Sequence, residues 1–235
     1  MEAKYAVRAA TPADVDGIVD VVLVAMAHDP QWDWRFVHKR EFPEDHYKFT
    51  RLLYEEFISP ANDDWHVMLA EAKSPDDSSK IVGFAVWDVS FANKAKMGPS
   101  YEPQNPTATV ARAGGSKRRD VAPQRQAAFR AGGGEKKKRF FDEYGDRQLH
   151  LKILGVHPDH WRRGIGSELV RWGMNRAFEE GIPVTLVAGS QGLHLYSRLG
   201  FKKLGEYVTQ VPGEEESVKS YGMVYRSQAS EEVQV

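Results

Sequence analysis

Arginine and glycine gather in one short turn of this chain, with a spacing that suits phosphate binding. The segment 151–167, LKILGVHPDHWRRGIGS, joins an apolar run typical of a buried strand to an apolar run typical of a helix. The first amides of a helix have no intrahelical acceptor and the dipole is positive there, so this position favours an anion. Glycines leave the backbone open to a bulky ligand, and two arginines add positive charge. The candidate ligand-binding residues are therefore Arg162, Arg163, Gly164, Ile165, Gly166 and Ser167.

The spacing within this turn excludes two common nucleotide-binding motifs. It is not GxxxxGK[ST], and a third glycine that would complete GxGxxG is missing. The turn instead resembles the acyl-CoA signature [QR]xxGx[GA] of the GNAT acetyltransferases, which follows a strand ending here in Leu154, Gly155 and Val156. Trp161 stands where the family has Gln or Arg. Because the family contacts phosphate mostly through backbone amides, the resemblance implies that acetyl-CoA binds at this turn.

A second segment carries the same resemblance. Residues 184–207, VTLVAGSQGLHLYSRLGFKKLGEY, predict a strand, a short helix capped by Ser190, a glycine stop and another strand. This segment is similar to the GNAT block LYxxLGF, here Leu195, Tyr196, Leu199, Gly200 and Phe201. Gly192, four residues before the tyrosine, is similar to the pattern of the puromycin-type and other small-molecule acetyltransferases.

The N-terminal half supplies the remaining elements by pattern. We expect strands at 5–9, 65–72 and 81–89, and helices from Thr11 to Ala27 and from Pro43 to Ile58. The resemblance implies an α/β (mixed α+β) GNAT fold, in which helices flank a central, mixed, mostly antiparallel sheet that splays at the CoA-binding strand. We expect residues 1–235 to form a single domain.

Composition excludes several classes of function. The 235 residues contain no cysteine, which excludes disulfides, thiolate metal sites and an acyl-cysteine intermediate. We expect no metal cofactor. No run approaches the roughly 18 apolar residues of a membrane span, so we expect a soluble, cytoplasmic protein without a membrane partner. Its oligomeric state, monomer or homodimer, stays open.

A basic insert interrupts the pattern at about 93–140. It holds twelve lysines and arginines against three acids, in a chain of net charge −1. Residues 93–122 are rich in Gly, Pro and Ala, which predicts a disordered or ligand-dependent loop, and a helix interrupted at Gly132–Gly134 follows from 122 to 142. The insert could be a solvated loop, a lid over the substrate, or a nuclear-localisation or nucleic-acid patch. We do not expect a nucleic-acid partner, but a nuclear location stays open. Residues 228–235 are expected to be a disordered tail.

The resemblance also assigns catalytic roles. Acetyl transfer from a thioester to an amine needs a base, a stabilised oxyanion and a proton for the departing thiolate. In the family a backbone amide at the end of the CoA-binding strand lies near the oxyanion, and the tyrosine matched by Tyr196 protonates the sulfur. The strand HLKILGVH is similar to HLHALAVH of serotonin N-acetyltransferase, which makes His150 the candidate base, while Lys152 replaces the second histidine. Alternation places His150, Lys152 and Leu154 on one side of this strand.

Other readings of these residues stay open. His150 could be structural, with Asp146, Glu143 and His194 as lesser candidates for the base. Trp32, Trp34 and Phe36, beside several acids, could form the substrate wall for a cationic or aromatic amine, or a buried apolar cluster. We expect an acetyl-CoA-dependent N-acetyltransferase that acts directly on a primary amine of a small molecule. The alternatives are a protein lysine or N-terminal acetyltransferase and a non-catalytic CoA-binding module.

Overall fold

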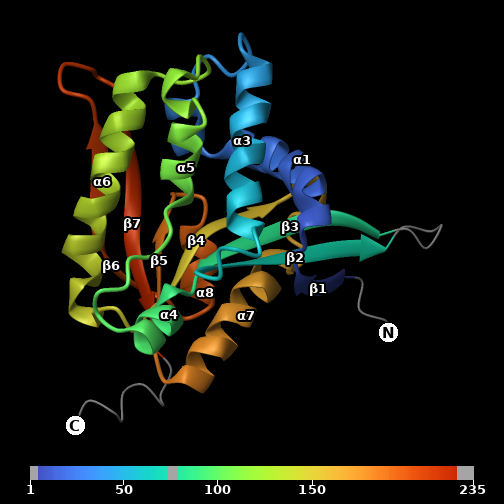
Figure 1. Ribbon diagram of the computed structural model, residues 1–235, viewed down its shortest axis with the longest axis vertical. Coiled ribbons are helices and arrows are strands. Elements are labelled where there is room, and N and C mark those ends of the chain that lie inside the picture. Colours follow the sequence, from blue (N-terminus) through green and yellow to red (C-terminus); the bar gives the residue numbers. More distant parts are fainter. Residues whose placement is uncertain (1–4, 74–78, 227–235) are drawn as a thin grey trace.

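The computed structural model describes residues 5–73 and 79–226. Seven strands form one sheet in the order β1-β2-β3-β4-β5-β7-β6 (Figure 1). Neighbouring strands are antiparallel except β4 and β5, which are parallel, so the mixed, mostly antiparallel sheet is confirmed. The strands are β1 Tyr5–Ala9, β2 Trp65–Lys73, β3 Ser79–Asp88, β4 Leu149–Val156, β5 Val184–Ala188, β6 Lys202–Gln210 and β7 Ser217–Tyr225.

Helices cover both faces of this sheet. The expected helix from Pro43 to Ile58 is confirmed as α3, and the first expected helix is split into short 3-10 turns around α1. In Figure 1, α6 lies along β6 and β7, and α5 lies along α3. The helices are α1 Val15–Ala25, α2 Pro30–Arg35, α3 Pro43–Ile58, α4 Ser90–Met97, α5 Pro106–Arg112, α6 Pro123–Phe141, α7 Ile165–Glu180 and α8 Leu193–Arg198. None of the helices in the described ranges is long and apolar enough to cross a membrane.

Two apolar clusters hold these layers together, one on each face of the sheet. On one face Leu169 of α7 packs with Trp87, and a Cβ at Gly173 would lie 2.2 Å from the Trp87 ring, so only glycine lets this helix approach. On the other face Ile18 of α1 and Tyr54 of α3 pack with Phe84. The central strands β3 and β4 are thus covered on both faces, which fixes their position relative to the helices.

The segment 93–122 is helical over part of its length, so the expectation of a loop throughout is wrong. It contains the end of α4, all of α5 and a short 3-10 turn. The overall composition did not predict this order, because a few residues are enough to provide it. Val110 and Val121 are buried, and the Asn105 side chain caps α5 by accepting a hydrogen bond from the Ala108 amide. The expected break in α6 is also wrong, because Gly132 packs against Tyr207 inside a continuous helix. The expected tail at 228–235 lies outside the described residues.

A buried polar network fastens this segment to the first helices. The Asp120 carboxylate, with no exposed surface, accepts hydrogen bonds from His46 Nδ1 at 2.7 Å and from Arg118 Nε and Nη2, each at 2.6 Å. Trp32 Nε1 donates to His46 Nε2 at 3.3 Å, which leaves the His46 proton on Nδ1 for Asp120. The network joins α2, α3 and the chain that leads into α6.

Candidate active site

Strands β4 and β5 separate after a short stretch of pairing, and this leaves one edge of β4 free. They pair only over Leu149–Leu151 and Val184–Leu186, whereas β4 stays paired with β3 as far as Val156. The His157 amide donates to Val82 of β3, so by alternation the N–H and C=O groups of Leu154 and Val156 point away from β3. The splay expected at this strand is therefore present, and it exposes backbone groups that can bind an extended ligand.

A bulge in β4 changes which side chains share a face. Trp87 pairs with Leu151 and Val86 with Ile153, so Lys152 is the extra residue. Leu154 consequently packs in the same cluster as Leu151, while Ile153 packs in the opposite one. The prediction that Leu154 shares a face with His150 and Lys152 is wrong, because simple alternation does not account for the extra residue.

The turn after β4 presents a run of unused amides. Arg162 and Gly164 have positive φ angles of 60° and 87°, and α7 begins at Ile165 with Gly164 as its N-cap. Within the described part of the chain, the amides of residues 162–167 donate to no backbone or side-chain acceptor. Nothing lies within 4 Å of a Cβ built at Gly164, so this side of the turn is open. Six amides, two exposed arginines and a helix N-terminus together favour an anion.

The side chains of the turn have different roles. Ile165 is buried in the core, so only its backbone is available to a ligand. Trp161, which departs from the family motif, donates its indole N–H to the Val156 carbonyl at 2.7 Å and so ties the turn to the end of β4. A Cβ at Gly166 would meet Leu195 at 3.3 Å and Leu154 and Val156 at 3.8 Å. These contacts bring α8, the helix that carries Tyr196, close to the free edge of β4.

Tyr196 lies between two packing partners. Its ring is 7% exposed, makes an edge contact with Phe201 at 5.7 Å between centroids, and covers Gly192, where a Cβ would lie 2.7 Å away. Burial, and then the nearby charge of Asp29, raises the pKa of the Tyr196 hydroxyl above its usual value. The side chain therefore keeps its proton at neutral pH. Gly192, and not the expected Ser190, is the N-cap of this helix.

A chain of hydrogen bonds orients His150. Gln148 Nε2 donates to the carbonyls of Gly145 at 2.7 Å and Phe141 at 3.3 Å, so its Oε1 accepts from Thr185 Oγ1 at 2.6 Å. Since the Thr185 proton is used, His150 Nδ1 must be the donor in its 2.9 Å contact with Thr185 Oγ1. This arrangement leaves a lone pair on His150 Nε2. Sequence reasoning missed Thr185 and Gln148, because only the pairing of β4 with β5 places Thr185 beside His150.

The environment of His150 shifts its pKa well below the usual value for histidine. Burial, followed by the positive charges of Lys152 and Lys137, lowers its pKa to about 3. His150 is therefore neutral at physiological pH. The lesser candidates for the base lie elsewhere: Asp146 is exposed and pairs with Lys94 at 2.5 Å, and Glu143 and His194 are exposed.

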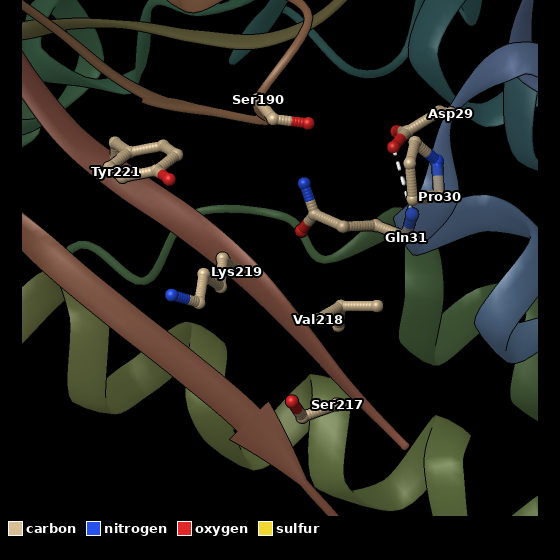
Figure 2. A pocket seen from close by; sticks show the side chains of 8 residues that line it. All are labelled: Asp29, Pro30, Gln31, Ser190, Ser217, Val218, Lys219 and Tyr221. Atoms are coloured by element: carbon tan, nitrogen blue, oxygen red, sulfur yellow. Dashed lines mark hydrogen bonds between the residues drawn. The ribbon is translucent and has the colours of Figure 1, made fainter.

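A pocket of about 230 Å³ lies beside the start of α2 (Figure 2). Asp29 Oδ1 accepts a hydrogen bond from the Gln31 amide at 2.9 Å and so caps α2, while burial raises the pKa of this carboxyl. Gly189, just after the end of β5, leaves room for the Gln31 side chain. A Cβ at this glycine would lie 3.0 Å from Gln31 Nε2. The pocket is lined by Asp29, Pro30, Gln31, Ser190, Ser217, Val218, Lys219 and Tyr221.

The three aromatic residues expected to form a substrate wall are packed inside the protein. Trp32, Trp34 and Phe36 are 8%, 5% and 4% exposed. Trp32 and Phe36 belong to the cluster around α1, and Trp34 packs with Val211 and Val218. The short helix α2 thus uses its rings for packing and presents polar residues to the pocket. Over residues 5–73 and 79–226, no three His, Asp or Glu side chains gather where they could hold a metal ion.

Comparisons with known proteins agree with this geometry. The acetyltransferase (GNAT) family matches residues 24–201. N-acetyltransferase family 8 member 3 of Rattus norvegicus is 38% identical over 65 residues, which make up 26% of this chain and 28% of that protein. The chain therefore matches less than a third of the length of this relative.

Solved structures share the fold at low sequence identity. A crystal structure described as histone acetyltransferase HPA2 and related acetyltransferase, from Corynebacterium glutamicum, has a TM-score of 0.56 and 21% identity, covering 94% of this chain and 96% of that one. The PaiA N-acetyltransferase of Thermoplasma acidophilum, in complex with coenzyme A, has a TM-score of 0.50 and 14% identity, covering 96% and 100%. These likenesses show the fold.

Proposed function

Since the chain belongs to the acetyltransferase (GNAT) family, we propose that it transfers acetyl from acetyl-CoA directly to a primary amine of a small molecule. One observation carries the proposal: the free edge of β4 leads straight into a turn with six unused amides. A thioester ligand with an amide-rich arm and a pyrophosphate needs a free strand edge for the arm, followed by an amide-rich turn for the pyrophosphate. The Thermoplasma protein was solved in complex with coenzyme A, which supports the same donor here.

The residues present fit such a donor. The free backbone groups of Leu154 and Val156, on either side of Gly155, would hold the arm, and residues 162–167 would hold the phosphates through their amides and the two arginines. Gly164 supplies the open surface for a bulky group. The bound donor would supply an acetyl group activated as a thioester.

The chain's own groups can serve each step of the transfer. The amine nitrogen forms a bond to the acetyl carbon, and the bond from that carbon to sulfur breaks. Backbone N–H groups of Leu154 or Val156 would stabilise the oxyanion. Tyr196 would give its proton to the leaving thiolate and regain one from solvent. His150 Nε2 would accept a hydrogen bond from the amine or from an intervening water, and the nitrogen would release its extra proton to solvent through that water.

A small acceptor is favoured by the volume of the pocket and by the bonds that hold the neighbouring elements together. Arg125 of α6 donates to Glu214 Oε2 at 2.6 Å, pairs with Glu216 at 2.7 Å and donates to the Trp34 carbonyl at 3.4 Å. These bonds join α6 to the turn between β6 and β7 and to α2, and so brace one side of the acceptor region. A pocket of about 230 Å³ suits a compact amine better than a folded protein segment.

The release of free thiol from acetyl-CoA tests this function. The purified chain would be assayed with a panel of small primary amines and, in parallel, with lysine-containing and free-N-terminal peptides. Turnover of small amines with little turnover of peptides supports the proposal. Faster turnover of peptides would favour a protein acceptor, and no thiol release with any acceptor would favour a CoA-binding module without catalysis.

His150 gives the first prediction about mechanism. Substituting His150 with alanine should lower kcat/KM by roughly tenfold, because a neutral hydrogen-bond acceptor for the amine is lost. With a pKa of about 3, His150 is deprotonated throughout pH 5–8, so the wild-type profile should show no acid limb from this group. The acceptor's own ionisation should set the profile instead.

The matched variant is Thr185→Val, which removes the acceptor for His150 Nδ1 without touching the ring. It should reproduce part of the loss, because the tautomer is no longer fixed. A wild-type acid limb near pH 6.5 that disappears in His150→Ala would contradict the neutral, oriented histidine.

A further inference from the structure

The face of β4 that looks toward α6 is open, although β4 is a central strand. Lys152, the extra residue of the bulge, has an exposed side chain, and His150 beside it is half-buried. Side chains on a central strand are exposed only where the layer above leaves a gap. Lys152 is therefore accessible on this face of β4, near enough to Arg35 of α2 and Lys136 of α6 for their charges to interact.

A second lysine faces this region from α6 and is almost completely buried. Lys136 is 4% exposed, and its Nζ lies 5.0 Å from the Phe129 ring centroid and 5.3 Å from that of Tyr207. In the described part of the chain, no carboxylate lies within ion-pair distance of Lys136. Burying a cation without a counter-ion costs free energy that two ring contacts only partly offset.

Arg35 of α2 completes the cluster. Its guanidinium lies 3.9 Å from the Phe129 ring centroid, and its Nε donates to the Gln31 carbonyl at 3.0 Å. No ion pair to Arg35 or Lys152 is formed by the residues that the structure describes. We call Arg35, Lys136 and Lys152 the cation cluster.

The positive charges of the cation cluster interact with one another. Burial, then the charges of Lys152 and Arg35, lowers the pKa of Lys136 to about 8, and burial also lowers the pKa of Arg35. Two carboxylates lie near enough to offset part of this charge, Asp88 toward Lys152 and Asp29 toward Arg35. Arg118 and Arg130 add positive charge near Arg35, so positive charge remains unbalanced around the cluster.

We propose that the acceptor amine also carries a carboxylate, which binds among Arg35, Lys136 and Lys152. This inference rests on the proposed function and names the class of acceptor. A carboxylate supplies negative charge that the cluster lacks, and it can accept charge-assisted hydrogen bonds from the three cations. The site is separate from the phosphate turn, because that turn follows the end of β4 and the cluster lies over its middle.

Pairs of amines that differ only in a carboxylate test the proposal. Suitable pairs are phenylalanine and phenethylamine, 4-aminobutyrate and propylamine, and 6-aminohexanoate and pentylamine. For at least one pair, the wild-type kcat/KM should be about tenfold or more higher for the acid, the size expected from one charge-assisted hydrogen bond. Lys136→Met should abolish this preference by raising KM for the acid, with the amine unaffected.

The control is Lys138→Met, which removes an exposed charge from the same helix and should keep the preference. Lys152→Met provides a second test if Lys136→Met does not fold. Two results would overturn the proposed carboxylate-binding site and leave the proposed function unaffected. One is equal kcat/KM for the two amines of every pair, and the other is a preference for the acid that persists in both Lys136→Met and Lys152→Met.

A binding measurement covers the case in which no amine of the panel is acetylated, which would count against the proposed function itself. Calorimetry would compare N-acetylphenylalanine with N-acetylphenethylamine on the full chain. The carboxylate-binding site is supported if the wild-type chain binds the acid more tightly than the amide without a carboxylate, and if Lys136→Met does not. Equal binding of the two, or binding of neither, overturns it.

Discussion

Replacing Tyr196 with phenylalanine is expected to lower kcat by roughly 10²–10⁴-fold, the range measured when a positioned proton donor is lost. The buried ring should stay in place, because its contacts with Phe201 and Gly192 do not involve the hydroxyl. Affinity for CoA should therefore change little. The measurement is steady-state thiol release together with calorimetric titration of CoA.

Tyr225→Phe is the matched control. Tyr225 also packs against Phe201, at 5.5 Å between ring centroids. The Tyr225→Phe change therefore removes a tyrosine hydroxyl from the same apolar cluster as the Tyr196→Phe change. We expect near wild-type kcat for this variant. Equal kcat in wild type and Tyr196→Phe would exclude Tyr196 as the acid, and a parallel loss in both variants would indicate a packing effect.

Replacing Asp120 with alanine is expected to lower the free energy of unfolding by about 3–5 kcal/mol, the cost of breaking a buried ion pair from one side. The change leaves the Arg118 guanidinium and His46 Nδ1 without the carboxylate that accepts three hydrogen bonds from them. Urea unfolding followed by tryptophan fluorescence measures the loss.

Asp16→Ala provides the comparison for this loss. Asp16 accepts from Arg51 Nε at 2.8 Å, but its side chain is 69% exposed, so its removal should cost at most about 1 kcal/mol. If the two variants lost equal stability, the Asp120 network would not hold the segment 93–122 in place.

The pH dependence of the Asp120 contribution has a definite sign. Burial alone would raise the pKa of Asp120, but the hydrogen bonds from His46 and Arg118 outweigh burial and lower it. A depressed carboxyl pKa stabilises the folded state above the unfolded value of about 3.9 and ceases to do so as pH falls through the folded value. The stability difference between wild type and Asp120→Ala should thus be constant from pH 5 to 8 and shrink only in more acid solution.

Local patterns in the sequence predicted the elements that local physics decides. The helix from Pro43 to Ile58 has a proline at its first position and a periodic apolar face, and its predicted bounds are those observed. The strand, turn and helix around Gly164 were predicted from glycine and arginine spacing and from the anion preference of a helix N-terminus. Both depend on neighbours within a few residues of one another.

Features that depend on tertiary contacts escaped prediction. The bulge at Lys152 arises from the register with Trp87, and the order of residues 105–121 depends on burial of Asp120 and Val110 against distant helices. Lys136 belongs to the run KKKR, whose composition is typical of a solvated basic patch. In the structure, Lys136 is the one buried residue of this run. Trp34, Trp32 and Phe36 look like binding residues in the sequence, but Trp34 packs against β7 and α6 and the other two rings pack in the cluster around α1.

Amide hydrogen exchange with and without CoA tests most directly whether the turn and the free edge of β4 hold the donor. Residues 162–167, and the amides of Leu154 and Val156, should exchange rapidly in the free protein, because no described group accepts from them. Saturating CoA should slow these amides by about tenfold or more, with no comparable change in α3. Unchanged exchange across residues 154–167 at a CoA concentration that supports turnover would contradict the account.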